Sequence, residues 1–140
     1  FEVSRSVRDK RFLYIRNYEP GRWPAGDPVD GGAPYYPNWS YGDIDGSPTK
    51  TYMLEHADKT HVRKLFELAC AKRPAEELYD LRRDPEQLNN VVGVPDYAAA
   101  RKELAAALQA ELAATGDPRA LDAGDVFDRY PYYGGQQPRR

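Results

Sequence analysis

Alternating polar and apolar positions open the chain and predict a β-hairpin over residues 2–18, with a polar break at residues 9–10. Its second strand is rich in aromatic and β-branched residues, which favour strands. This strand carries two apolar faces, with Phe12, Tyr14 and Tyr18 on one and Leu13 and Ile15 on the other.

Helical periodicity appears twice further along. Residues 50–71 are predicted to be helical in two pieces, with Asp58 as the N-cap of the second. Residues 95–115 form the clearest helix, with an i, i+4 stripe of Leu104, Leu108 and Leu112 and a stop at Gly116. Between the two helical regions, residues 76–81 read as a short strand in which Leu78 and Asp80 share one face.

A long segment without periodicity, residues 19–49, is predicted to be an irregular loop. It contains six prolines and six glycines, which interrupt helices and strands. Disordered segments are poor in aromatic residues, yet this one holds Trp23, Tyr35, Tyr36, Trp39 and Tyr41. We therefore expect the loop to be ordered against another surface.

The order β-β, loop, α, β, α predicts an α+β fold, a small antiparallel sheet packed against two helices. We expect residues 1–118 to form one subdomain and residues 119–140 a polar tail.

Charge and composition exclude several classes of partner. Lys plus Arg (20) nearly balance Asp plus Glu (22), for a net charge of −2, so no basic field predicts nucleic-acid binding. No run approaches the roughly 18 apolar residues of a membrane span, so no membrane partner is expected. An anionic ligand would need individual arginines or lysines. The 11 tyrosines and 2 tryptophans suit either a half-exposed binding surface or packing at the rim of loops.

The residues that could carry chemistry are few. Cys70, the single cysteine, sits on an apolar helix face and is expected to be buried and structural. His56 and His61 are five residues apart and would not share a face of one helix, so no zinc pair is predicted. Asp43 and Asp45 near Gly46 fit a turn better than a calcium loop. No catalytic residue and no metal ligand is therefore assigned.

Residues 74–91 contain the most distinctive motif, which is called a phrase below. It consists of Glu77-Leu78-Tyr79-Asp80-Leu81, two arginines, Asp84-Pro85, Glu86 and then Asn89-Asn90. On its own chemistry it is a strand, a turn set by Asp84-Pro85, and asparagines that tolerate capping conformations. Together with residues 5–18 and the helix beginning at residue 95, it resembles the C-terminal region of the sulfatases. It resembles in particular the branch that includes N-sulfoglucosamine sulfohydrolase and its bacterial relatives, and the resemblance covers roughly residues 4–118.

That resemblance implies a parent enzyme that hydrolyses sulfate esters or N-sulfates on carbohydrates such as glycosaminoglycans. Its N-terminal catalytic domain would carry calcium and a formylglycine made from a C/S-x-P-S-R motif. This chain contains no such motif, since Cys70 is followed by Ala71-Lys72-Arg73. We therefore expect a scaffold and substrate-pocket subdomain that is not an enzyme alone and has no cofactor of its own. The resemblance also implies a periplasmic, secreted or lysosomal-type location.

The expected contacts with a sulfated carbohydrate come mainly from the aromatic loop, because aromatic faces stack on sugar rings and arginine binds sulfate in bidentate fashion. They are Arg22, Trp23, Tyr35, Tyr36, Trp39 and His56. Alternatively, the aromatic residues pack on the catalytic domain and His56 is an exposed or capping residue. A stand-alone carbohydrate-binding module or a structural interaction module also remains open.

Overall fold

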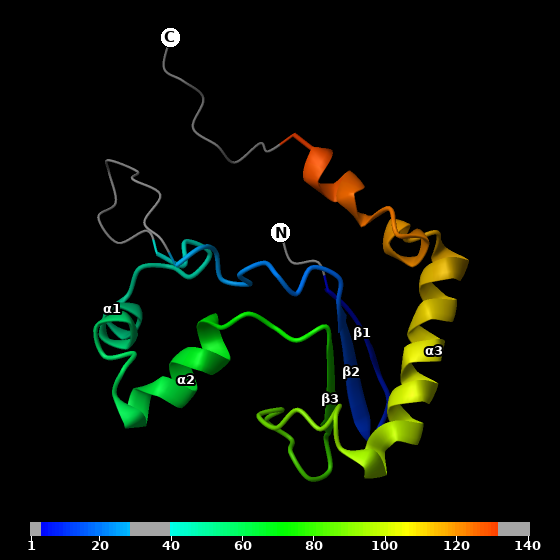
Figure 1. The fold of residues 1–140 in the computed structure, drawn as a ribbon, viewed down its shortest axis with the longest axis horizontal. Helices are drawn as coiled ribbons and strands as arrows, with labels where there is room; N and C mark the ends of the chain where they lie inside the picture. Colours follow the sequence, from blue (N-terminus) through cyan, green and yellow to red (C-terminus); the bar gives the residue numbers. More distant parts are fainter. Residues whose placement is uncertain (1–3, 29–39, 132–140) are drawn as a thin grey trace.

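The computed structural model describes residues 4–28 and 40–131 of the chain (Figure 1). Its elements are β1 (Ser4–Arg8), β2 (Phe12–Asn17), α1 (Pro48–Glu55), α2 (Thr60–Cys70), β3 (Glu76–Asp80), α3 (Ala98–Thr115) and the short 3-10 helices η1 (Pro95–Tyr97), η2 (Pro118–Leu121) and η3 (Gly124–Arg129). The predicted α+β class is confirmed.

The three strands form one antiparallel sheet in the order β1-β2-β3. Tyr14, at the centre of β2, lies opposite Val7 on β1 and Leu78 on β3. The hairpin turn is closed by Asp9, whose Oδ1 accepts hydrogen bonds from the backbone N–H of Arg11 (2.7 Å) and Phe12 (2.6 Å). The predicted hairpin is therefore confirmed over the residues that the structure describes.

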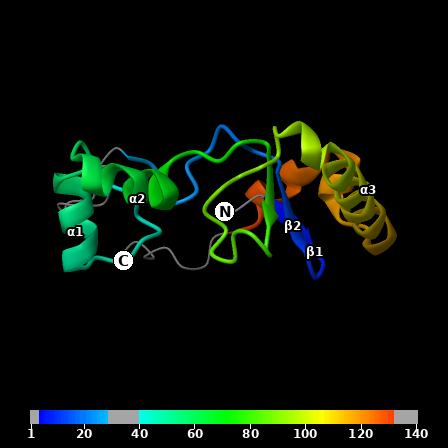
Figure 2. The same ribbon diagram turned by 90° about the horizontal axis from the view of Figure 1, so that it is seen from below.

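Helix α3 covers one face of this sheet, and α1 and α2 lie on the other side (Figures 1 and 2). The leucine stripe of α3 packs on the aromatic face of β2 and on Leu78, whose exposed fraction is 0%. The helix ends as predicted, because Gly116 takes the left-handed conformation with φ of 69°. This cluster contains Phe12, Tyr14, Leu78, Leu104, Leu108 and Leu112.

Beside this core, one carboxylate ties α3 to two strands. Glu76 on β3 accepts hydrogen bonds from Arg101 Nε (2.6 Å) and Nη2 (3.0 Å) on α3, and from Arg16 Nη1 (3.0 Å) on β2. The hydrogen bonds from Arg101 hold the pKa of Glu76 below its ordinary value. Burial above all, and the negative charge of Glu76, raise the pKa of Tyr14 to about 12.

A second, smaller core joins the described part of the loop to the two other helices. Ala25, Tyr41 and Cys70 are buried there, and the ring of Tyr41 meets both Trp23 and Phe66 edge-on. Gly26 is required at its position, because its φ is 86° and a Cβ would lie 2.9 Å from the backbone N of Gly42. Residues 23–26 and 41–44 are thus packed against α2.

The predicted helix 50–71 does divide in two, but its details differ. Helix α1 begins at Pro48, since Ser47 Oγ accepts a hydrogen bond from the N–H of Lys50 (3.1 Å). The prediction that Asp58 caps α2 is wrong. Lys59 is the N-cap residue and makes no side-chain cap, while Asp58 is exposed and pairs with Lys59 Nζ at 3.5 Å.

The polar residues of the phrase at residues 74–91 are bound to nearby backbone. Asn90 Oδ1 accepts hydrogen bonds from the N–H of Leu78 (2.9 Å) and Val92 (3.0 Å), and Asp84 Oδ2 accepts one from the N–H of Asn89 (2.8 Å). These bonds hold the segment after β3 against the outer edge of the sheet. In the described structure the phrase therefore acts as a fold signature.

Beyond α3, the chain turns back over the end of the sheet. Asp117 caps η2 by accepting a hydrogen bond from the N–H of Arg119 (2.9 Å) and also binds Arg5 Nε of β1 at 2.7 Å. Arg119 is buried, with its guanidinium 3.9 Å from the ring centroid of Phe127 in η3. Within the described ranges, no helix is both long and apolar enough to cross a membrane.

Replacing Leu78 by alanine should destabilise the fold by about 3 kcal/mol, because the change leaves a cavity between the sheet and α3. Denaturant unfolding followed by circular dichroism measures the change. Leu121→Ala is the matched control, because Leu121 is 73% exposed and should shift the free energy of unfolding by less than about 0.5 kcal/mol. Equal effects of the two substitutions would contradict this packing.

Replacing Glu76 by glutamine should destabilise the protein at pH 7 and have less effect near pH 3. A carboxyl whose pKa is lowered by folding adds stability above its unfolded pKa, near 4.5 for this residue, and that stability is lost as the pH falls through the folded pKa. Thermal unfolding across this pH range tests the prediction. Glu103→Gln, at an exposed glutamate of α3, is the control, and its effect on stability should not depend on pH in this way. The same dependence of stability on pH for both variants would contradict the prediction.

Candidate functional site

A large open groove lies between α2 and the face of the sheet opposite α3. Its volume is about 1030 Å³, and it is bounded by β2, β3, the start of the loop after β2 and the segment after β3. Apolar side chains form much of its wall, among them Leu13, Ile15, Leu68 and Leu88. This groove explains why β2 has two apolar faces, since one packs on α3 and the other lines the groove.

The floor of the groove carries a network of three polar side chains. Asn17 Nδ2 donates to Glu77 Oε1 (2.8 Å) and to the carbonyl oxygen of Pro74 (2.6 Å), and Tyr79 OH donates to Glu77 Oε2 (2.5 Å). Asn17 and Glu77 are buried. Burial, followed by the hydrogen bond to Glu77, raises the pKa of Tyr79 well above its ordinary value. Both oxygens of Glu77 are thus bound from within, and the network gives the groove a fixed polar floor.

Arg22 and Trp23 are among the residues that line this groove. The Arg22 guanidinium binds the Asp128 carboxylate through two parallel hydrogen bonds, from Nη1 to Oδ1 (2.8 Å) and from Nη2 to Oδ2 (2.5 Å). This hydrogen bonding raises the pKa of Arg22 and lowers that of Asp128. The ring of Trp23 meets Tyr41 edge-on and has Lys72 Nζ 5.0 Å from its centroid. Trp23 therefore belongs to the second core and also borders the groove.

The other expected contact residues are not gathered here. Tyr35, Tyr36 and Trp39 lie outside the described residues. His56 follows the end of α1 and is not among the residues that line the groove. Its ring stacks on Tyr52 with centroids 4.2 Å apart, and its Nδ1 lies 2.9 Å from the Tyr52 carbonyl oxygen.

The helix break changes the relation between the two histidines. His61 lies on α2, and its Nε2 is 3.2 Å from Tyr52 OH, so Tyr52 contacts both His56, just after α1, and His61. The spacing of five residues would separate the two histidines on one continuous helix, but the helix is broken between them, so the spacing does not decide how they lie.

The described residues offer no evident centre for metal or nucleophilic chemistry. In residues 4–28 and 40–131, no group of three or more histidine, cysteine or acidic side chains is placed to hold a metal ion. Cys70 is buried as predicted, and burial raises the pKa of its thiol, which disfavours the reactive thiolate. Asp43 lies in a turn, with its N–H bound to the carbonyl oxygen of Ala25 (3.2 Å).

Sequence reasoning missed the polar floor and the partner of Arg22. Asn17 and Glu77 lie far apart along the chain and meet only through the pairing of β2 with β3. The alternation of β3 already placed Tyr79 on the face opposite Leu78, which was a usable signal. Nothing in the sequence indicated that Asp128 would reach Arg22.

Two curated proteins of Formosa agariphila, both described as ulvan-active sulfatases, are similar to this chain. One is 30% identical over 128 residues, which are 91% of this chain and 20% of that protein. The other is 30% identical over 114 residues, which are 81% of this chain and 18% of that protein. The chain thus spans about a fifth of the length of these relatives. No protein-family profile matches it.

Replacing Asn17 by aspartate should destabilise the protein by about 2 kcal/mol at pH 7, because the hydrogen bonds to Glu77 and to the Pro74 carbonyl oxygen are lost and a second carboxylate faces Glu77. The deficit should shrink below about pH 4, where carboxyl groups take up protons. Asn17→Ala loses the same bonds without adding charge and should be more stable than Asn17→Asp at pH 7. Equal pH dependence of the two variants in urea unfolding would contradict the network.

Proposed function

Because the chain is homologous to sulfatases, we propose that it is the C-terminal scaffold and substrate-pocket subdomain of an enzyme that hydrolyses sulfate esters or N-sulfates on carbohydrates. The observation that carries this proposal is the extent of the similarity, which covers 91% of the chain and a fifth of one sulfatase. A segment related in this way, with a groove and no assigned nucleophile, is suited to shaping a pocket around chemistry performed elsewhere.

The proposed partner is an N-terminal catalytic domain of the sulfatase type. Calcium and formylglycine would belong to that domain, and neither is assigned to a residue here. We also propose a location outside the cytoplasm, in keeping with carbohydrate substrates. The N-sulfoglucosamine sulfohydrolase branch remains the proposed subfamily, and an ulvan-like polysaccharide is an equally direct candidate substrate because of the relatives' description.

Within this chain, the rim of the groove is the proposed substrate contact. Trp23 offers an aromatic face for a sugar ring and Arg22 a guanidinium for a sulfate. That both residues line the same groove supports this assignment. Tyr35, Tyr36, Trp39 and His56 remain proposed contacts that would be brought to the substrate by the loop or by the whole enzyme. Residues 1–118 remain the proposed subdomain, with residues 119–140 as an appended tail.

A second candidate function is a carbohydrate-binding module that acts without the catalytic domain. The specific observation in its favour is that Arg22 and Trp23, which suit a sulfated sugar, line one open groove of about 1030 Å³. A structural interaction module would use the same groove for protein packing. Binding and activity measurements separate these functions.

The 140-residue chain should show no turnover of an aryl sulfate in the presence of calcium, because no nucleophile is assigned to it. The whole protein encoded by the gene should hydrolyse the same substrate, and a C/S-x-P-S-R motif should be found in the coding sequence before Phe1. Turnover by the 140-residue chain above a buffer blank, or absence of that motif, would contradict the proposal. Tight binding of sulfated oligosaccharides by the chain alone, together with a whole protein that lacks sulfatase activity, would favour the module.

In the whole enzyme, Trp23→Ala should raise the KM for a sulfated polysaccharide about tenfold, which corresponds to about 1.4 kcal/mol of binding. The KM for a small aryl sulfate should change little, because that substrate does not reach the stacking surface. Trp23→Phe should restore most of the affinity, and Tyr130→Ala, at an exposed aromatic residue, is the matched control. If Trp23→Ala impaired the hydrolysis of both substrates equally, the result would indicate misfolding and contradict a substrate contact at Trp23.

A further inference from the structure

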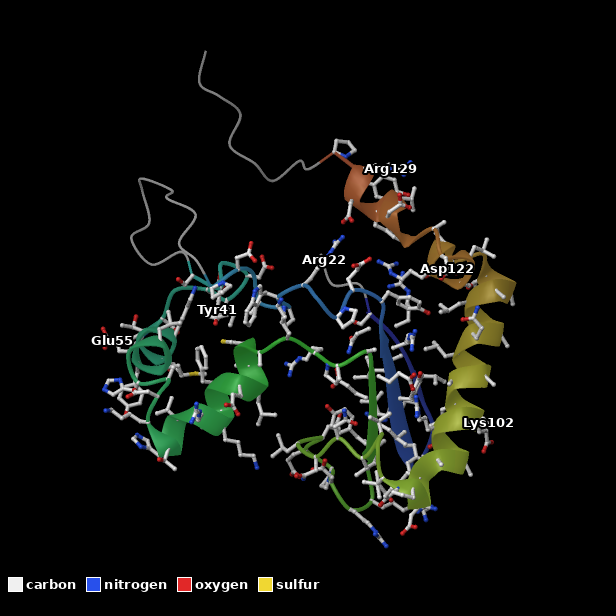
Figure 3. All side chains as sticks on the ribbon, viewed as in Figure 1. Arg22, Tyr41, Glu55, Lys102, Asp122 and Arg129 are labelled. Carbon is white, nitrogen blue, oxygen red and sulfur yellow. The ribbon has the colours of Figure 1, made fainter. Side chains whose placement is uncertain are left out.

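The pairing of Arg22 with Asp128 has the geometry that a sulfate ester would require. Two parallel N–H···O bonds join the planar guanidinium to two oxygens of one anionic group, at 2.8 and 2.5 Å. A sulfate ester also carries one negative charge and presents three terminal oxygens, so it can accept the same pair of bonds. Figure 3 shows Arg22 on the loop between the sheet and the C-terminal segment.

The element that carries Asp128 is weakly held. Helix η3 has no buried residue. Among the described residues, its side-chain hydrogen bonds are the local pair of Arg129 with Asp125 and the pair of Asp128 with Arg22. Both partners of the latter are well exposed, with side-chain exposures of 43% and 39%, so water and dissolved ions reach the pair and screen its attraction. An anion of the right shape could therefore replace Asp128 without disturbing either core.

A second arginine lies beneath η3. The Arg119 guanidinium is covered by the ring of Phe127, the residue before Asp128, at 3.9 Å. Its side chain is 3% exposed, and in the part of the chain that the structure describes, its Nε and Nη1 have no hydrogen-bond acceptor. The closest carboxylate oxygen, Asp117 Oδ1, is 3.8 Å from Nη1. A buried guanidinium with free N–H groups is costly, and a bound anion would offset that cost.

We propose that Asp128 occupies, in the absence of ligand, the position at which Arg22 binds the sulfate group of a sulfated sugar. The ligand's sulfate displaces Asp128 together with η3, and this movement uncovers Arg119 as a second sulfate-binding residue. The sugar ring then extends from Arg22 into the groove beside Trp23. This inference rests on the proposed function, because it takes the substrate to be a sulfated carbohydrate.

The test uses the 140-residue chain, glucose 6-sulfate, inorganic sulfate and unsulfated glucose, with binding followed by NMR titration. Asp128→Asn should lower the Kd for glucose 6-sulfate about fivefold, because it frees the binding-competent state of Arg22. Asp125→Asn makes the same charge change in the same helix, where Asp125 pairs with Arg129, and should leave the Kd unchanged. Arg22→Gln should raise the Kd for glucose 6-sulfate at least about fivefold. Unsulfated glucose should not compete with glucose 6-sulfate for the site.

Displacement of η3 is measured separately by hydrogen exchange. Saturating glucose 6-sulfate should speed amide exchange in residues 124–129 of the wild-type chain and shift the side-chain Nε–H signal of Arg119. A Kd that is the same for Asp128→Asn and Asp125→Asn, an unaffected Arg22→Gln variant, or unchanged exchange in η3 would overturn the inference. The sulfatase assay of the whole protein is independent of these results, so the proposed function could stand while this inference fails.

Comparing inorganic sulfate with glucose 6-sulfate shows whether the site binds the sulfate group alone or the sulfated sugar. A gain in affinity of Asp128→Asn for both inorganic sulfate and glucose 6-sulfate, with the sugar binding more tightly, supports the inference in full. Binding of neither anion by Asp128→Asn overturns it.

Discussion

The packing of α3 on the aromatic face of the sheet is the contact on which the rest of the structure depends. Leu78 lies at its centre with no exposed surface, between Tyr14 of the neighbouring strand and the leucine stripe. Helix α3 and the hairpin are far apart along the chain. Leu78 of β3 is buried between them, so the same contact holds β3 beside β2. Glu76 then bonds to both Arg16 and Arg101 and adds directional contacts to an otherwise apolar interface.

That alignment also creates the other face of the sheet. Once Leu78 points to α3, the pleat directs Glu77 and Tyr79 to the opposite side. The antiparallel register brings Ile15 opposite Glu77 and Leu13 opposite Tyr79. The same strands therefore supply a packed core on one side and a groove with a polar floor on the other. The second core, around Tyr41 and Cys70, places α2 and the loop residues Arg22 and Trp23 around that groove.

The polar residues divide into those that serve the fold and those free to act at the groove. Asp9, Asp84, Asn90 and Asp117 all accept hydrogen bonds from backbone N–H groups that a turn, a helix end or the edge of the sheet would otherwise leave unpaired. Arg22 differs, because its partner is an exposed carboxylate on a short and weakly held helix. The proposed anion site at Arg22 rests on this difference.

The sequence by itself determined the strands, the two-part helical region and the leucine-striped helix, because alternation, helical spacing and turn residues are local properties. It also indicated the sulfatase relationship through residues 74–91. It misplaced the cap of α2, where local preference for aspartate did not decide the helix start. Only the tertiary structure decided the groove, the Asn17–Glu77–Tyr79 floor and the pairing of Arg22 with Asp128. Asn17 and Glu77 are 60 positions apart, and Arg22 and Asp128 are 106 positions apart. These contacts follow from strand register and from the return of the chain after α3, which no local pattern encodes.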